Sequence, residues 1–410
     1  MTGPAAADSI SPTSRRDGQD VKKKRTAVFY VPYTIIGGSH HSLLGFIEGL
    51  RPGWRTLVVY SEENPEFTRL YTGRGVECRR LEVPGILHHG DLRRPWRLAR
   101  DFFRAIRGLR RLVREERAAL IYGESFLGRL MAALAALGLP TVSVGYIRMC
   151  SDLGLLDRLT YALADAYVVI SETVLRAAVP WAKMRPRKLF KVYNGVWLDR
   201  FSPGPADLEL KKSLGLEGRP VIGYYGRFAP FKCPDTLLQS LAILRKRGRT
   251  EVRLLLVGKP HEAAYPGFAA KLEQLIEREG LQEAVVRTGY VEDVRPYVRA
   301  ADIVAVPSDL EPFGRAVIEA MALARPVVGG NNGGIPEIAT DGVDALLVPP
   351  REPEALALAL ERLLDDPELR GRLAEAGRRT VERRFDMRTN QRKLRALMGF
   401  LVRRKAGPAA

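Results

Sequence analysis

The sequence predicts an α/β protein of two doubly wound domains that face each other across a cleft. Short β-branched runs alternate with runs of helical periodicity along most of the chain, which is the pattern of parallel α/β units. The pattern breaks once, in the turn-rich segment VYNGVWLDRFSPGP at 192–205, and then begins again. The length of 410 residues also favours two domains, because single cores stop growing near about 250–300 residues.

Composition and pattern divide the chain into four parts. A basic tail at 1–25 is expected to be disordered, and it is followed by a first domain at 26–200, a linker at 201–217 and a second domain at 218–385. The tail lacks the apolar stretch of a secretory signal, and the three cysteines form no CxxC pair. We therefore expect a cytoplasmic protein with reduced thiols.

Each half contains five expected strands. In the first half they are Ala27–Pro32, Thr56–Tyr60, Ala119–Tyr122, Thr141–Val144 and Ala166–Ile170, with helices near Ser39–Leu50, Pro95–Glu116 and Gly128–Leu137. In the second half they are Val221–Tyr225, Val252–Val257, Val285–Gly289, Ile303–Val306 and Val327–Val328, with helices between them. Ligands of such sheets bind beyond the carboxyl ends of the strands, so the cleft between the domains is the expected site.

The net charge of +18 is concentrated near the amino terminus. Residues 1–117 hold 22 Lys and Arg against 13 Asp and Glu, and Arg93–Arg117 alone holds ten Arg. Within that segment a core stripe is expected, with arginines on the remaining faces, and its members are Phe102, Ile106, Leu109 and Val113, with Phe103 and Leu112 alongside. The charge favours anionic partners, and the arginine face is equally compatible with simple solvation and with docking on an anionic membrane.

The stretch EPFGRAVIEAMALARPVVGGNNGGIP at 311–336 carries the most chemistry. Glu311 precedes a Pro-Phe-Gly turn, and Glu319 lies in the helix that follows. Eight helical residues would separate them by roughly 12 Å, so they would serve different parts of one ligand. The amides of Gly314 and Arg315 would begin the helix, and a helix N-terminus attracts an anion. Two hydroxyl acceptors beside an anion cradle predict a sugar-nucleotide site.

Two further loops follow strands. After the strand VIGYY, the loop that begins at Gly226 carries Arg227 and Lys232, two cations placed to neutralise a diphosphate. After the first strand, Gly37 and Gly38 would let the backbone approach a phosphate or sugar closely. A solvated loop and an ordinary strand-to-helix turn are the corresponding structural alternatives.

Other catalytic arrangements are not recognisable in the sequence. No DxD pair follows a strand as a metal–phosphate clamp would, and no Ser/His/Asp or Cys/His constellation is apparent. Asp293 and Asp302 are expected to be structural. We expect neither a metal nor a cofactor.

At this point the chain resembles the retaining GT-B glycosyltransferases of family 4. The resemblance runs from residue 26 to about 403 and is most specific in the second half, in GYYGRFAPFKCPDTLLQSLAIL, GYVEDVRPYVRAADIVAVPSDLEPFGRAVIEAMALARPVV and GGIPEIATDGVDALLVPP. It implies two Rossmann-like domains, the second holding a nucleotide-sugar donor and the first holding most of the acceptor. It also implies that a final helix, at 386–404, crosses back to the first domain.

The resemblance assigns roles residue by residue. Arg227 and Lys232 would bind the diphosphate and Glu311 the sugar hydroxyls, and these three are the expected catalytic residues. The expected donor-binding residues are Gly37, Gly38, Gly226, Val291, Phe313, Gly314, Arg315 and Glu319. Among them Glu319 would bind the ribose, Val291 would lie near the base, and Phe313 to Arg315 would act through backbone amides. The implied mechanism is metal-independent transfer with retention, in which the leaving phosphate accepts the acceptor's proton.

Two departures from the family pattern concern the sugar. Many relatives place a His near the end of the fourth strand, where this chain has Val144-Gly145-Tyr146. Arg315 stands where a small or aliphatic residue is usual, and its charge would suit an acidic or phosphorylated group. The first departure leaves room for an unusual acceptor or donor.

The sequence thus predicts transfer of a hexose-type sugar from a UDP- or GDP-linked donor. The expected acceptor is a glycoconjugate or polysaccharide precursor, carbohydrate or lipid-linked, at the inner face of the cytoplasmic membrane. The alternatives are a GT-B enzyme with a soluble small-metabolite acceptor and a non-catalytic nucleotide-sugar-binding protein. A nucleic-acid-binding protein is disfavoured, because aromatic residues are not interleaved with the arginines as stacking platforms would require.

Overall fold

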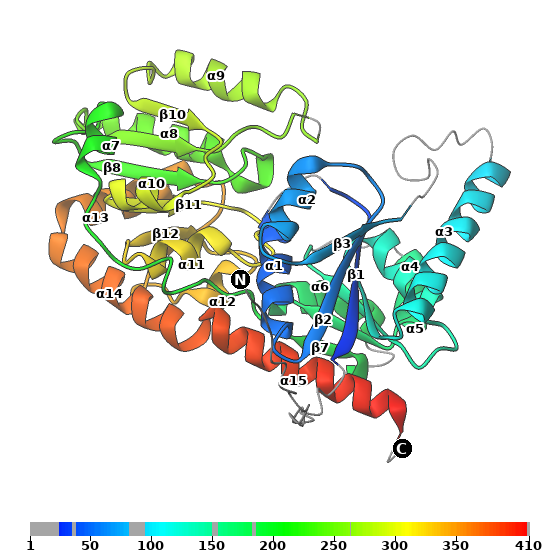
Figure 1. The fold of residues 1–410 in the computed structure, drawn as a ribbon. Coiled ribbons are helices and arrows are strands. Elements are labelled where there is room, and N and C mark those ends of the chain that lie inside the picture. Colours follow the sequence, from blue (N-terminus) through cyan, green and yellow to red (C-terminus); the bar gives the residue numbers. More distant parts are fainter. Residues whose placement is uncertain are drawn as a thin grey trace, which may run out of the picture.

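Two parallel β-sheets, one in each half of the chain, organise the molecule (Figure 1). The computed structural model describes residues 24–34, 38–81, 95–149, 155–182, 186–262 and 264–407. Within these residues the first sheet has the strand order β3-β2-β1-β4-β5-β6-β7 and the second the order β10-β9-β8-β11-β12-β13. All neighbouring strands run parallel. The predicted pair of doubly wound α/β domains is confirmed.

The elements have the following bounds. The strands are β1 (Arg25–Val31), β2 (Trp54–Tyr60), β3 (Glu77–Arg80), β4 (Ala118–Gly123), β5 (Val142–Ile147), β6 (Ala166–Val169), β7 (Leu189–Lys191), β8 (Val221–Tyr225), β9 (Arg253–Val257), β10 (Val285–Gly289), β11 (Ile303–Val306), β12 (Val327–Gly330) and β13 (Leu346–Val348). The α-helices are α1 (Gly38–Leu50), α2 (Pro65–Thr72), α3 (Pro95–Glu115), α4 (Phe126–Ala136), α5 (Leu155–Leu163), α6 (Glu172–Ala182), α7 (Leu208–Ser213), α8 (Pro234–Lys246), α9 (Phe268–Arg278), α10 (Arg295–Ala300), α11 (Arg315–Ala322), α12 (Ile335–Ile338), α13 (Pro353–Asp365), α14 (Pro367–Arg384) and α15 (Met387–Ala406).

The five strands predicted in each half are all present, and all of them except β10 are mostly buried. Every residue of β8 and β11 is buried, and six of the seven residues of β1 are. A parallel strand covered by helices on both faces is apolar throughout, which makes it visible in the sequence. Three further strands, β3, β7 and β13, were not predicted. β3 and β7 are only partly buried at the two ends of the first sheet, so they carry no apolar run.

The segment predicted as a linker, 201–217, contains the short helix α7. Asp207 caps this helix, since its carboxylate accepts a hydrogen bond from the amide of Leu210 at 3.0 Å. None of the six residues of α7 is buried. A helix of this length without an apolar face leaves no periodic signal in the sequence.

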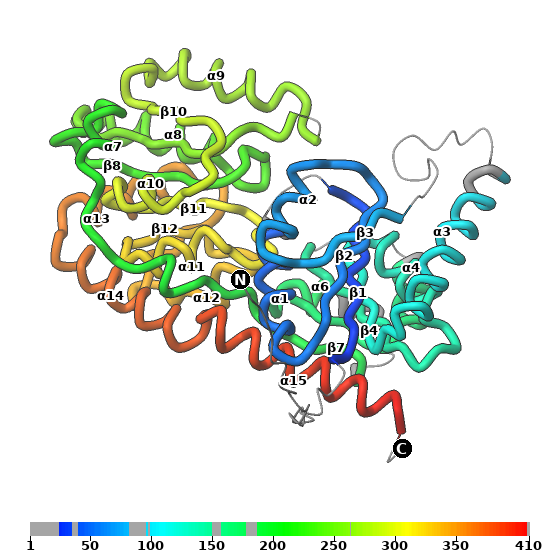
Figure 2. Tube along the Cα trace, viewed as in Figure 1, coloured from blue at the N-terminus to red at the C-terminus, as the bar shows by residue number. Residues whose placement is uncertain are grey.

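The chain passes between the domains twice, and the two passages lie side by side. The amide of Val196 donates to the carbonyl of Phe385 at 2.9 Å, and the amide of Met387 donates back to the carbonyl of Val196 at 3.0 Å. From there α15 runs beneath the first domain, as the trace from α14 to α15 shows (Figure 2). Lys405 near its end donates to the carbonyl of Thr141 at 2.7 Å. The final helix therefore packs on the first domain.

Candidate functional site

In each sheet the strand order reverses between two neighbouring strands. The reversal falls between β8 and β11 in the second sheet and between β1 and β4 in the first. Such reversals open a crevice at the carboxyl ends of the strands, where ligands of doubly wound folds bind. The residues that follow β1, β4, β8 and β11 are therefore candidates for a ligand-binding site.

At the reversal in the second sheet, the structure brings two of the predicted catalytic residues together. Lys232 ends the 3₁₀ turn Pro230–Lys232 after β8, and Glu311 lies in the loop after β11. The Lys232 ammonium forms an ion pair with the Glu311 carboxylate. Glu311 is 8 % exposed, so the Lys232 ammonium balances the charge of a carboxylate that is almost fully buried.

Arg227 is available to an anion at the same place. It follows Gly226 directly after β8 and is exposed. Its carbonyl accepts a hydrogen bond from the Tyr224 hydroxyl at 3.1 Å, whereas no side chain in the described part of the protein accepts one from its guanidinium. No atom lies within 4 Å of the position that a β-carbon on Gly226 would take. The loop thus presents a guanidinium beside open space.

The turn that carries Glu311 rests on a pair of glycines. The amide of Gly334 donates to the Glu311 carbonyl at 2.6 Å. A β-carbon on Gly333 would lie 2.5 Å from that same carbonyl oxygen, so only glycine fits there. The sequence analysis did not single out Gly333 and Gly334 as part of the site. Their adjacency within 311–336 was the available signal, but their contact with the turn requires the fold.

Helix α11 starts where the sequence placed it, and its first turn is oriented by Gly314 and Phe313. Gly314 takes φ +110°, a left-handed conformation that favours glycine. Phe313 is 2 % exposed, and its ring packs 5.9 Å from that of Tyr193 and 5.8 Å from that of Phe385. The Phe313 side chain is therefore core, and only its backbone can face a ligand.

On α11, Glu319, the residue predicted to bind the ribose, already forms an ion pair with Arg315. Arg315 Nη2 donates to Glu319 Oε1 at 2.5 Å, one helical turn away. The Glu319 side chain is 16 % exposed and that of Arg315 33 %. A ligand hydroxyl that binds Glu319 must share it with Arg315 or displace it.

Helix α1 of the first domain lies within electrostatic range of α11. Gly38 is the first residue of α1, whereas Gly37 lies outside the described residues. His40 is buried, with its ring against Phe67 at 5.5 Å and Nε2 3.2 Å from the Tyr33 carbonyl. Burial lowers the pKa of His41, and Arg315 lowers it further while Glu319 raises it. His41 of the first domain is thus close enough to interact electrostatically with Arg315 and Glu319 of the second domain.

Val291 lies at the same edge of the second sheet but apart from the residues above. It follows β10 and is half-buried against the larger core. The neighbouring Tyr290 is 62 % exposed, and Lys259 lies over its ring at 5.6 Å. Among the described residues no hydrogen bond joins Val291 to the loops of Lys232 or Glu311, so Val291 lies near this edge without a polar partner there.

A direct link between the domains was missed by the sequence analysis. The Glu337 carboxylate of α12 accepts hydrogen bonds from the amides of Glu172 and Thr173, both at 2.6 Å, at the start of α6. Ser171 Oγ donates to the Pro312 carbonyl at 2.5 Å in the turn after Glu311. These partners are more than a hundred residues apart in the sequence, so no local sequence pattern predicts their contact. They tie the loop of Glu311 to the first domain.

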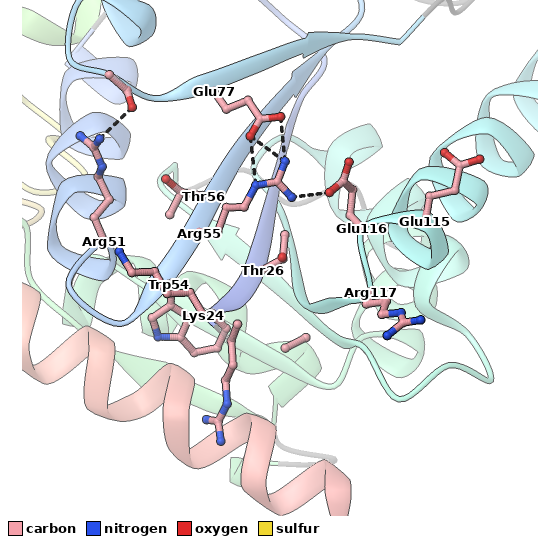
Figure 3. Close-up of a pocket in the computed structure, with 13 residues that line it drawn as sticks. Lys24, Thr26, Arg51, Trp54, Arg55, Thr56, Glu77, Glu115, Glu116 and Arg117 are labelled. Carbon is pink, nitrogen blue, oxygen red and sulfur yellow. Dashed lines mark hydrogen bonds and ion pairs between the residues drawn. The ribbon is translucent and has the colours of Figure 1, made fainter. Parts of the chain in front are cut away.

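A groove of about 820 Å³ lies at the opposite edge of the first sheet (Figure 3). Its charges are largely paired: Arg55 lies between Glu77 and Glu116, and Arg51 donates to backbone carbonyls. It is lined by residues at the starts of β1, β2 and β4. It is therefore distinct from the strand ends that the predicted residues occupy.

The arginine-rich helix α3 has a buried and an exposed face. Leu109 and Val113 are buried, as the stripe predicts. Phe103, however, is 60 % exposed, as is Trp96, so the prediction that Phe103 belongs to the core stripe was wrong. At 100° per residue Phe103 falls on the same side as Trp96 and Arg107. An aromatic pair thus lies among arginines on one face.

The described residues contain neither a candidate metal site nor a candidate membrane-spanning helix. No group of three or more His, Cys, Asp or Glu side chains within them is arranged to hold a metal ion. Among the helices that the structure describes, none combines the length and the apolar character needed to cross a bilayer.

A family model and several curated proteins match part of the chain. Residues 207–380 match the family model described as "Glycosyl transferases group 1". The chain is 36 % identical over 169 residues to an alpha-D-kanosaminyltransferase of Streptomyces kanamyceticus, covering 41 % of this chain and 42 % of that protein. It is 34 % identical over 231 residues to a D-inositol 3-phosphate glycosyltransferase of Kineococcus radiotolerans, covering 53 % of each. The matches thus span about half the length of these curated relatives.

Solved structures match over nearly the whole chain. The Anabaena protein HepE in complex with UDP-glucose superposes with a TM-score of 0.79 at 23 % identity, covering 92 % of this chain and 99 % of that one. A glycosyltransferase from Rickettsia africae superposes with a TM-score of 0.81 at 18 % identity, covering 93 % and 99 %. At these identities the likeness concerns the fold.

Proposed function

We propose that this chain, whose second domain is a glycosyl transferases group 1 domain in a GT-B fold, moves a sugar from a nucleotide-sugar donor to a hydroxyl of an acceptor. The observation that carries the proposal is the meeting of Lys232 with Glu311 at the strand reversal of the second sheet, beside the exposed Arg227. A cation pair and a carboxylate at a strand-end crevice suit a diphosphate joined to a hydroxyl-bearing sugar.

The donor would lie along the edge of the second sheet. Arg227 and Lys232 would neutralise the diphosphate, and Glu311 would accept hydrogen bonds from the sugar hydroxyls. Glu319 would hold the ribose, and Val291 would lie near the base. The remaining contacts would come from backbone, at Gly37, Gly38, Gly226, Phe313, Gly314 and Arg315.

The chemistry that this arrangement supports is stabilisation of the departing diphosphate. Preorganised cations aimed at developing charge are usually the largest catalytic contribution of such a site. In the proposed front-face transfer with retention, the anomeric carbon–oxygen bond to the diphosphate breaks as the acceptor oxygen bonds to that carbon. The acceptor's proton passes to the leaving phosphate. Arg227 and Lys232 take the role that a metal ion would otherwise have, so no metal or cofactor enters the proposal.

The donor nucleotide is proposed to be UDP- or GDP-linked. Support for UDP comes from the fold likeness to HepE, which was solved in complex with UDP-glucose. The Arg315–Glu319 pair bears on the same step, because the ribose hydroxyls would compete with Arg315 for Glu319. An Arg315 released in this way would be left beside the diphosphate and the sugar.

For the acceptor, a small metabolite is favoured over a polysaccharide precursor. The curated relatives include D-inositol 3-phosphate glycosyltransferases, whose name specifies a small, hydroxyl-rich molecule. A lipid-linked or glycoconjugate acceptor at the cytoplasmic face of a membrane is the second candidate. Its support is the face of α3, where Trp96 and Phe103 are exposed among arginines.

The test is calorimetric titration of UDP, GDP, ADP and dTDP into the wild type and Glu319→Ala. We expect one nucleotide to bind more tightly than the others and to lose about tenfold or more in affinity in the variant, as for a lost hydrogen bond to a charged group. Glu375→Ala is the matched control, because Glu375 also pairs with an arginine one turn away, Arg379, on the exposed face of α14. Binding of none of the four nucleotides, or equal binding by Glu319→Ala, would contradict the proposed donor site.

Turnover separates an enzyme from a non-catalytic binding protein. The nucleoside diphosphate that binds most tightly identifies the donor base. A nucleotide sugar with that base is incubated with the protein and a panel of hydroxyl acceptors, and release of the free nucleoside diphosphate is measured. The proposal expects release that Arg227→Ala reduces at least tenfold. Binding without release would identify a nucleotide-sugar sensor instead.

A further inference from the structure

A buried ion pair that the donor site does not use lies at the carboxyl ends of β4 and β5, next to the strand reversal of the first sheet. Glu124 follows β4, and Arg148 follows the neighbouring strand β5. Arg148 Nε lies 3.1 Å from Glu124 Oε1, and only 9 % of the Arg148 side chain and 16 % of the Glu124 side chain are exposed. Both residues stand at the carboxyl ends of their strands, the edge at which doubly wound sheets bind ligands.

The pair leaves hydrogen-bonding capacity unfilled. Arg148 Nη2 and Glu124 Oε2 are buried and have no hydrogen-bond partner in the described part of the structure. A buried polar atom without a partner costs free energy, and a buried ion pair is a weak source of stability compared with apolar packing. The neighbouring interior is aromatic, and the Arg148 guanidinium lies 4.4 Å from the centre of the Tyr146 ring. Apolar residues would serve the fold at least as well here.

The surroundings keep the cluster electrically neutral. Burial opposes the charged form of Arg148, but Glu124, Tyr122 and Tyr146 together raise its pKa, so it stays cationic and balances the Glu124 carboxylate. Burial raises the pKa of Tyr122 and Tyr146 and lowers that of His40, so these three are uncharged near pH 7. A neutral cluster offers no net attraction to a phosphate. It offers guanidinium N–H donors and a carboxylate acceptor within one ion pair.

Helix α1 connects this cluster with the donor site. His40 lies within the electrostatic reach of Glu124 and Arg148, and the next residue, His41, lies within that of Arg315 and Glu319. The cluster is therefore on the first-domain side of the same junction. In the donor arrangement proposed above, that is the side from which an acceptor must approach the sugar.

We infer that Arg148 and Glu124 form an acceptor subsite that recognises neighbouring hydroxyl groups of a neutral, hydroxyl-rich molecule such as a cyclitol or a sugar. Arg148 Nη2 would donate to one acceptor hydroxyl, and Glu124 Oε2 would accept from the next. This inference rests on the proposed function. It also accounts for the absence of a histidine at 144–146, since the polar groups come from the residues that follow the two strands.

The test measures polyol binding by saturation-transfer NMR, with and without UDP. The probes are myo-inositol, methyl α-D-glucoside and myo-inositol 1-phosphate, titrated into the wild type and the double variant Arg148→Met/Glu124→Leu. The double variant removes both charges together, so it avoids leaving either one buried alone and is expected to fold. Lys405→Met is the matched control, because it removes an ion-pair partner, that of Asp165, at the opposite edge of the same sheet.

We expect the wild type to bind at least one neutral probe, and the double variant to bind it about tenfold or more weakly. UDP affinity should stay within about twofold in both variants, and Lys405→Met should bind the polyol as the wild type does. Equal polyol binding by the double variant, or no neutral probe bound by the wild type, would overturn the subsite. Tighter binding of the phosphate ester than of myo-inositol, lost with Arg148, would replace it with an anion site. Failure of UDP and every other nucleotide to bind the wild type would instead count against the proposed function.

Discussion

Individual residues of the candidate site are held in pairs before any donor arrives. Lys232 is paired with Glu311 and Arg315 with Glu319, so two cations and two carboxylates stand ready in fixed positions. Preorganisation of this kind lowers the cost of arranging charges during the reaction. Each pair must nevertheless be shared with the donor, which makes its members informative targets for substitution.

Glu311→Gln should separate sugar recognition from nucleotide recognition. Because Glu311 is proposed to bind the sugar hydroxyls, we expect UDP affinity to change by less than about threefold while turnover of the nucleotide sugar falls about 10- to 100-fold, the size of a hydrogen bond to a charged group. Calorimetry and a nucleotide-release assay measure the two quantities. A variant that loses UDP affinity as strongly as turnover would show that Glu311 acts through Lys232 on the diphosphate instead.

His40 should make the protein less stable in mild acid. Burial holds its pKa below the ordinary value of 6.5, so the unfolded chain binds a proton more readily than the folded one. His40 therefore contributes its full stability above pH 6.5 and loses it as the pH falls from there toward the lowered value. The slope from this one group is at most about 1.4 kcal/mol per pH unit. Unfolding free energies of the wild type and His40→Asn between pH 5 and 8 should converge as the pH falls, and a constant difference would contradict this origin.

Among the helices and strands, those with a buried apolar run or a clear turn signature could be predicted from the sequence. Strands β8 and β11 are fully buried apolar runs, and the turn before α11 carries the Pro-Phe-Gly signature, so both could be located. The edge strand β3, with the sequence ECRR, carries no such signal. The Glu337 link to α6 joins residues 165 positions apart and depends on how the two domains pack. The pairing of Lys232 with Glu311 is of the same kind, because their types were predictable and their contact was not.

In the second acceptor candidate, the exposed face of α3 would bind an anionic membrane. Trp96 and Phe103 would insert between lipids while the surrounding arginines contact anionic headgroups. Wild-type protein should then co-sediment with vesicles containing phosphatidylserine, and Trp96→Ser/Phe103→Ser should reduce the bound fraction several-fold at physiological salt. Leu358→Ser, at a similarly exposed apolar residue on α13 of the second domain, serves as the control. Equal sedimentation of all three proteins would assign the face to simple solvation.

At the scale of the whole molecule, Glu337 connects the donor loop with the first domain. Its carboxylate caps α6 while Ser171 holds the Pro312 carbonyl, so the junction is closed by hydrogen bonds as well as by the two chain passages. Glu337→Ala leaves the α6 amides without their partner, and we expect a loss of about 1–3 kcal/mol in unfolding free energy. Denaturant titration measures it. Glu352→Ala, which precedes α13 without capping it through its side chain, should change the free energy by less than about 0.5 kcal/mol.

Comparison of UDP with uridine shows whether the strand reversal of the second sheet binds a diphosphate. Calorimetry on the wild type, Arg227→Ala and Arg219→Ala gives the affinity that the diphosphate adds in each protein. Arg219 is an exposed arginine at the opposite end of β8 and serves as the matched control. We expect the wild type and Arg219→Ala to bind UDP far more tightly than uridine, and Arg227→Ala to lose about tenfold or more of this difference. An unchanged difference in Arg227→Ala would show that the diphosphate does not bind at this strand reversal.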